Sequence, residues 1–113
     1  MRATTLLPLL LLGATGCVPA PGPGTLLLSN IDFGPTQVEA VITANPDCAV
    51  RDAGYVDTEA FVLPVRGTRF ISAPAGADVC WRRDLDPDNP AARRWTDWAR
   101  AYLAPGRIVD STL

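Results

Sequence analysis

The chain of 113 residues contains no histidine, and all 10 of its basic residues are arginines, so lysine is absent as well. The three serines therefore have no side chain nearby of the kind that activates a nucleophilic hydroxyl in hydrolases. The sequence also lacks a glycine-rich phosphate-binding loop. Without histidine or a close pair of cysteines, it lacks the usual ligands of a zinc site. We therefore expect no catalytic residue, no cofactor and no enzymatic activity.

The chain also has no excess of positive charge. The 10 arginines stand against 12 acidic residues, which gives the chain a formal net charge of −2. Proteins that bind nucleic acid neutralise its phosphate backbone with clustered basic side chains. The charge balance therefore argues against a nucleic-acid partner.

The longest apolar run lies at the N-terminus, and it is short. It extends from Ala3 to Ala14, about 12 residues, whereas a helix that crosses the hydrocarbon core of a membrane needs roughly 20. Arg2 precedes the run, and small residues follow its leucines. This order is typical of a secretory signal peptide, which is removed after export.

The four residues Ala14-Thr15-Gly16-Cys17 resemble the lipobox of bacterial lipoproteins. In that family the cysteine thiol receives a diacylglycerol group, and the chain is cut before the cysteine. The resemblance implies that residues 1–16 are a signal peptide and that Cys17 is the lipid-attachment site. Val18 follows where aspartate would retain an enteric lipoprotein in the inner membrane, so the resemblance implies a periplasmic protein anchored to the outer membrane. Because leucine is usual at the position of Ala14, cleavage without a lipid is the alternative.

The two remaining cysteines are Cys48 and Cys80. A lipid on Cys17 leaves these two to pair, and an exported protein folds in an oxidising compartment. We predict a Cys48–Cys80 disulfide, which closes a loop that the chain-entropy model values at roughly 3–4 kcal/mol. Two separate buried thiols are the alternative.

Residues 17–24 contain three prolines and two glycines but no side chain suited to a core. We interpret them as a tether that, when extended at about 3.1 Å per residue, holds the domain roughly 20 Å from the membrane. The following residues, 25–113, are enough for one small domain and too few for two.

The body of the chain predicts a mainly β fold, a small β-sandwich-like domain. Residues 36–44 alternate, with Val38, Ala40 and Ile42 on one face. We expect residues 25–33 and 36–44 to form a hairpin, and residues 45–57 to form a long loop held by Cys48. We expect three further strands, at residues 59–65, 68–74 and 77–85, to form a meander. An edge strand is expected at residues 107–113.

Residues 88–106 predict one C-terminal amphipathic helix. Asn89 is a good N-cap, Pro90 suits the first helical position, and a proline-glycine pair ends the run. Four residues then share one face of the helix: Ala91, Trp95, Trp98 and Tyr102. This face either docks the helix onto a sheet or contacts a partner protein.

Three aspartates, Asp84, Asp86 and Asp88, are spaced as in the opening of a calcium loop. However, the sixth position of such a loop is Asn89 where glycine is required, and the twelfth is Trp95 where a carboxylate is required. These aspartates are therefore weak metal candidates. The alternative is a solvated turn in which they pair with Arg82, Arg83 or Arg93.

Two functions from different classes are compatible with these features. The first is a structural or protein-interaction role in the cell envelope, in which the anchored domain docks on an envelope protein through an open sheet edge or its tryptophan face. The second is a periplasmic domain that binds a small ligand or a calcium ion at the arginine-rich and aspartate-rich segment 82–94.

Overall fold

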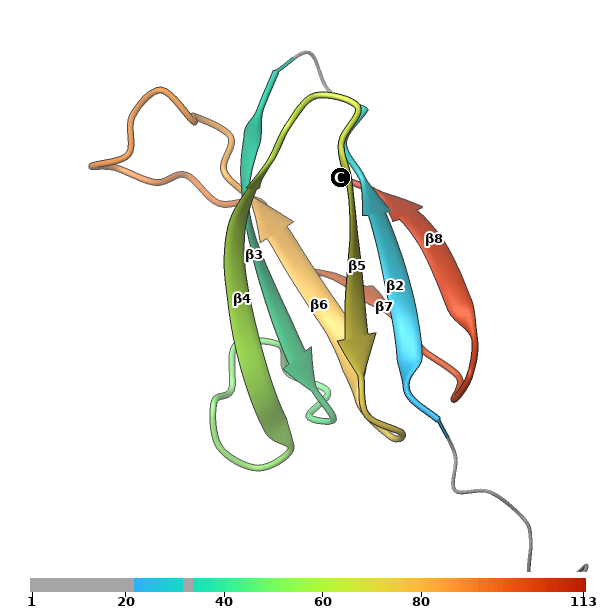
Figure 1. The fold of residues 1–113 in the computed structure, drawn as a ribbon. Coiled ribbons are helices and arrows are strands. Elements are labelled where there is room, and N and C mark those ends of the chain that lie inside the picture. The colour runs from blue at the N-terminus through green and yellow to red at the C-terminus, as the bar shows by residue number, and fades with distance from the viewer. Residues whose placement is uncertain (1–21, 32–33) are drawn as a thin grey trace, which may run out of the picture.

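The computed structural model describes residues 22–31 and 34–113, which form two β-sheets (Figure 1). A three-stranded sheet has the order β5-β2-β8, with strands Thr68–Ala73, Gly24–Ser29 and Ile108–Thr112. A four-stranded sheet has the order β4-β3-β6-β7, with strands Tyr55–Leu63, Thr36–Thr43, Asp78–Arg83 and Ala99–Ala101. The prediction of a mainly β fold is confirmed. The signal peptide, Cys17 and most of the tether lie outside the described residues.

The core lies between the two sheets and follows the alternation of the strands. Leu26 and Leu28 of β2 are fully buried, and so are Val38 and Ala40 of β3 in the other sheet. Because neighbouring residues of a strand point to opposite faces, Glu39 between them lies on the outer face. The predicted inward face of residues 36–44 is confirmed.

The predicted hairpin between the first two strands is wrong. β2 pairs with β5 and with β8, whereas β3 pairs with β4 and β6 in the other sheet. The chain crosses between the sheets after β2, where buried Asn30 donates side-chain hydrogen bonds to the carbonyl oxygens of Leu63, at 2.8 Å, and Gly34, at 3.0 Å. An alternating pattern shows that a strand has one buried face, but it does not say which strand lies beside it. Two such strands can also bury their apolar faces from opposite sides of the core.

The predicted meander is also wrong, although its strands and turns are present. β4 and β6 belong to the four-stranded sheet, whereas β5, between them in sequence, belongs to the three-stranded sheet. The connections at 64–67 and 74–77 therefore cross from one sheet to the other. Pro64 and Pro74 stand directly after strands, where a missing N–H costs least. The predicted edge strand at residues 107–113 is confirmed as β8, which runs parallel to β2.

The predicted C-terminal helix is not present in the described residues. The segment 85–98 forms a loop, and the short strand β7 follows and pairs with β6. Hydrogen bonds to distant residues replace those of a helix: Leu85 and Thr96 donate backbone N–H groups to Arg94 and Arg83 at 2.7 and 2.9 Å. Capping residues and helical periodicity are local signals, and tertiary pairing overrides them here.

Candidate functional site

The disulfide between Cys48 and Cys80 is present, with 5.9 Å between the two Cα atoms. Cys80 lies on the outer face of β6, while its neighbour Trp81 points into the core and is 6% exposed. Cys48 belongs to the loop between β3 and β4. The bond therefore holds this loop against the outside of the four-stranded sheet and does not connect the two sheets. Together with Val41, the two cysteines form a second small cluster, against which Tyr55 and Trp98 pack.

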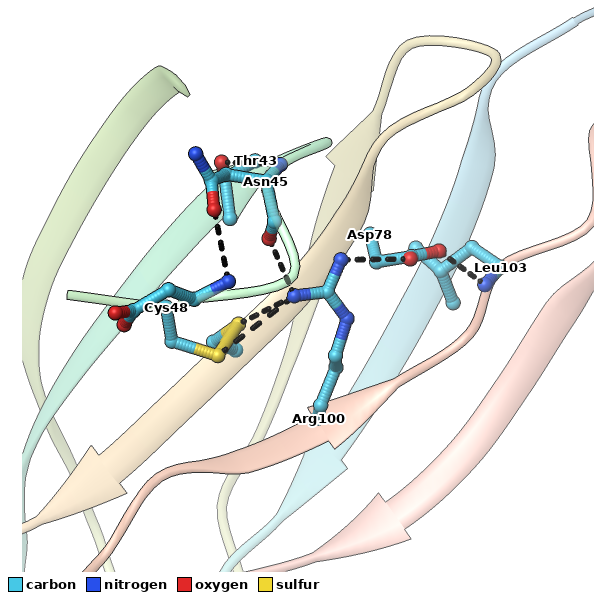
Figure 2. Close-up of polar contacts among 8 residues, drawn as sticks. Thr43, Asn45, Cys48, Asp78, Arg100 and Leu103 are labelled. Carbon is cyan, nitrogen blue, oxygen red and sulfur yellow. Dashed lines mark hydrogen bonds and ion pairs between the residues drawn. A yellow bond between two sulfur atoms is a disulfide. The ribbon is translucent and has the colours of Figure 1, made fainter. Parts of the chain in front are cut away.

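Arg100 of β7 lies against this disulfide, as Figure 2 shows. Its Nη1 donates a 2.7 Å hydrogen bond to the carbonyl oxygen of Asn45 and lies 3.6 and 3.8 Å from the sulfur atoms of Cys80 and Cys48. Its Nη2 forms a 3.0 Å ion pair with Asp78. One largely buried guanidinium thus joins β7, β6 and the loop that carries Cys48.

Asp78 completes this cluster from the start of β6. Its second oxygen accepts a 2.9 Å hydrogen bond from the backbone N–H of Leu103, just after β7. The role of Arg100 was not predicted from the sequence, because Arg100 lies outside the apolar face of the expected helix. The sequence does contain a local signal here, since Ala99, Ala101 and Leu103 alternate with Arg100 and Tyr102. That is the alternation of a strand.

Arg82 organises a second cluster on the same outer face. Its guanidinium carbon lies 4.8 and 4.5 Å from the ring centres of Trp95 and Trp98. It also forms an ion pair of 2.7 Å with Glu39 on the neighbouring strand. Cation–π contacts of this kind stabilise an exposed arginine by roughly 0.5–1 kcal/mol each. The loop that carries the two tryptophans is therefore docked on the sheet through Arg82.

The three aromatic residues proposed as a partner contact do not form one continuous surface. Trp95 and Trp98 are half-buried beside Arg82, as described above. Tyr102 lies at the other end of the sheet and is 76% exposed, with its ring 5.5 Å from the guanidinium of Arg100. The structure brings the two tryptophans together and separates the tyrosine from them.

Asp84 is buried, at 2% exposure, and anchors the loop that follows it. Its carboxylate accepts hydrogen bonds from Arg93 at 2.9 Å and from the backbone N–H groups of Asp86 and Arg94 at 2.9 and 3.1 Å. The Arg93 hydrogen bond first, and the Asp86 N–H next, hold the pKa of Asp84 below its ordinary value, although burial opposes the shift. The predicted pairing with Arg93 is confirmed, but the prediction of a solvated turn is wrong for Asp84.

A calcium site is not assembled from the three weak candidates. Both oxygens of Asp84 already accept hydrogen bonds from the protein, and Asp86 contributes a backbone N–H to that carboxylate. Within residues 22–31 and 34–113, no group of three or more histidine, cysteine, aspartate or glutamate side chains is placed to hold a metal ion. The spacing of the aspartates serves a hydrogen-bonded turn in this loop.

One cleft has a volume of about 410 Å³ and lies between the loop 85–98, the start of β3 and the end of β4. Most of its lining cannot accept or donate a proton in catalysis: Gly34, Pro35, Gln37, Val62, Pro87 and Pro90. Asp88 and Arg93 are the two charged residues at its wall. This composition does not form a nucleophile with a base, so the cleft offers no catalytic arrangement.

Comparison with known proteins does not assign the chain to a family: no family model, curated protein or solved structure matches it. In the described part of the chain, no helix has the length and apolar character needed to cross a membrane.

Replacing both Cys48 and Cys80 with alanine is expected to lower the free energy of unfolding by about 3–4 kcal/mol, because the loop between them is no longer closed in the unfolded chain. A guanidinium chloride titration measures this change. Wild-type protein in the presence of a reductant serves as the control and is expected to unfold at the same concentration as the variant. A loss of less than about 1 kcal/mol in both samples would contradict a stapling role.

The stability contribution of Asp84 is expected to depend on pH. Because its pKa is lowered by folding, the contribution is complete above the unfolded value of about 3.9 and is lost as the pH falls through the lower folded value. Asp84→Asn should therefore melt below wild type at pH 7, and the difference should shrink on acidification below pH 4. Thermal melts followed by tryptophan fluorescence measure this, with exposed Asp88→Asn as the control. Parallel melting curves for wild type and Asp84→Asn at all pH values would contradict it.

Proposed function

We propose that the protein is a lipid-anchored protein of the bacterial cell envelope, held at the outer membrane through Cys17 and facing the periplasm. One observation carries this proposal. The disulfide uses Cys48 and Cys80, so Cys17 is the remaining cysteine of the three. It stands in the sequence that resembles a lipobox, where a thiol must be available for the lipid.

The anchored part is proposed to be a β-sandwich whose role is structural or is an interaction with another envelope protein. A disulfide that staples a loop supports export, because such bonds persist in oxidising compartments. The proposal includes no enzymatic role, because histidine and lysine, which activate nucleophilic hydroxyls in hydrolases, are absent from the sequence.

The surface proposed to contact a partner protein is the cluster of Arg82, Trp95 and Trp98. Aromatic side chains and arginine are enriched in the centres of protein interfaces. Here the Glu39 ion pair and the cation–π contacts hold the three side chains in one arrangement. A rigid surface of this kind loses little conformational entropy on binding.

The alternative, a small-ligand or calcium-binding domain, has less support. A cation at Asp84 would have to displace Arg93 and two backbone N–H groups from the carboxylate. These donors already occupy both oxygens of the carboxylate, so a cation would replace existing hydrogen bonds and would not fill an empty site. A rise in melting temperature on addition of calcium would favour this alternative.

Cys17→Ala is expected to release the protein from the membrane, because it removes the thiol that takes the lipid. Full-length wild type and variant are expressed in a bacterial host and separated into membrane and soluble periplasmic fractions. Wild type should be in the membrane fraction and Cys17→Ala in the soluble fraction. The Cys48→Ala/Cys80→Ala double variant is the matched control and should stay in the membrane fraction. Membrane retention of Cys17→Ala, or soluble wild type, would overturn the lipid anchor.

A photo-reactive amino acid at Asp97, which is exposed between the two tryptophans, is expected to cross-link one discrete envelope protein in cells. Adding Trp98→Ala should abolish the cross-link, because the contact surface is lost, while the disulfide is retained. The same photo-reactive group at exposed Thr68 of β5 is the control and should not form the adduct. An adduct that persists with Trp98→Ala, or none from position 97, would refute this surface.

A further inference from the structure

Three segments meet at the end of the two-sheet domain where the chain enters β2. The backbone N–H of Gly106 donates to the carbonyl oxygen of Pro23 at 3.0 Å, and that of Thr25 donates to Arg107 at 2.9 Å. Gly24 pairs with Ala73, the last residue of β5. Residues 22–25, 73–77 and 102–108 are therefore neighbours, and we call them the tether-side rim (Figure 1).

The tether-side rim is apolar and nearly free of charge. Tyr102 and Ile108 are 76% and 65% exposed, and the prolines at 74 and 105 are also exposed. Arg107 is the one charged residue in the three segments. The Tyr102 and Ile108 side chains both belong to the segment that hydrogen-bonds with Pro23 and Thr25, where the tether joins the domain.

Two other loops of the domain carry more charged residues than the tether-side rim. The loop 44–54 lies at the same end, under the four-stranded sheet, and carries the exposed residues Asp47, Arg51 and Asp52. At the opposite end, the segment 84–94 contains three aspartates and two arginines. At the end of the domain that carries the tether, the uncharged surface therefore lies on the side where the tether joins.

We propose that the tether-side rim lies on the headgroup region of the membrane that holds the lipid anchor. This inference rests on the proposed function, since it requires the anchor at Cys17. The chain from Cys17 to Gly24 advances by seven residues, which span at most about 25 Å. The rim is the part of the described domain nearest to the tether. A tether that is not fully extended therefore brings the rim to the lipid surface, in place of the spacing of roughly 20 Å expected for an extended one.

The side chains of the rim suit a lipid headgroup. Tyrosine is enriched at the membrane–water interface, where its ring is half-immersed and its hydroxyl remains hydrated. Arg107 presents a guanidinium that can hydrogen-bond lipid phosphate oxygens. Such a contact is too small to bind free vesicles strongly, but an anchor raises the effective concentration of the rim at the surface to the millimolar range.

Tryptophan fluorescence in vesicles with brominated acyl chains tests this placement. The lipidated full-length protein is reconstituted into phosphatidylethanolamine and phosphatidylglycerol, and the signal of Tyr102→Trp is compared with that of wild type. Val65→Trp is the matched control, since Val65 is 45% exposed and lies at the opposite end. We expect the tryptophan added at position 102 to be quenched at least twofold more than the one at position 65. Equal quenching, or none at position 102, would overturn the proposal.

A charge placed in the rim provides a second measurement on the same variant. Adding Ile108→Glu to Tyr102→Trp should remove the extra quenching, because a carboxylate in the rim opposes contact with an anionic surface. Adding Val62→Glu, at a residue that is 57% exposed outside the rim, should leave the quenching unchanged. Loss of quenching with both, or with neither, would contradict the rim as the contact surface.

Failure of the lipid anchor is distinguished by intact mass. If wild type carries no acyl group, the proposed function fails, and an N-terminal histidine tag on vesicles that contain a nickel-chelating lipid then supplies an anchor at the same end. The chain has no histidine of its own, so the tag alone sets the attachment point. Quenching at position 102 in this arrangement would support the rim, and its absence would refute it.

Discussion

The Cys48–Cys80 disulfide is the constraint on which the outer face of the four-stranded sheet depends. The loop 44–54 has few apolar side chains with which to offset the entropy of ordering its backbone. The bond fixes Cys48 against β6, and this places the carbonyl oxygen of Asn45 within 2.7 Å of Arg100. Arg100 in turn holds Asp78, which accepts a hydrogen bond from the chain just after β7. One covalent link and one guanidinium thus define this side of the domain.

The exclusive use of arginine is consistent with this construction. Four arginines, at positions 51, 69, 82 and 100, lie over aromatic rings, and each also has a hydrogen-bond acceptor or a carboxylate within reach. A planar guanidinium can stack and donate several hydrogen bonds at once, whereas a lysine ammonium acts as a compact point charge. One of the four arginines, Arg82, holds the loop with Trp95 and Trp98 on the outer face of the four-stranded sheet. The tether-side rim has a single arginine and no carboxylate, so the two proposed contact surfaces differ in chemistry and in position.

Local patterns in the sequence predicted the strands and the disulfide but not how the strands associate. The alternation of residues 36–44 and the counting of cysteines each depend on few residues, and both predictions are confirmed. The partner of each strand depends on the whole core, in which β2 pairs with β5 and β8 in one sheet while β3 belongs to the other. The expected helix failed for the same reason. Its capping and periodicity were weaker than the tertiary hydrogen bonds around Asp84 and the pairing of β7 with β6. The contacts of Arg82 and Arg100 connect residues far apart in the sequence, which no local pattern contains.

We propose that the Cys48–Cys80 bond leaves Cys17 for the lipid. Intact mass of the protein purified from bacterial membranes, alkylated before or after reduction, tests this arrangement. We expect a chain that begins at Cys17 and carries acyl mass, with two cysteines that become alkylated only after reduction. A chain without acyl mass, or a cysteine alkylated without reduction, would contradict it.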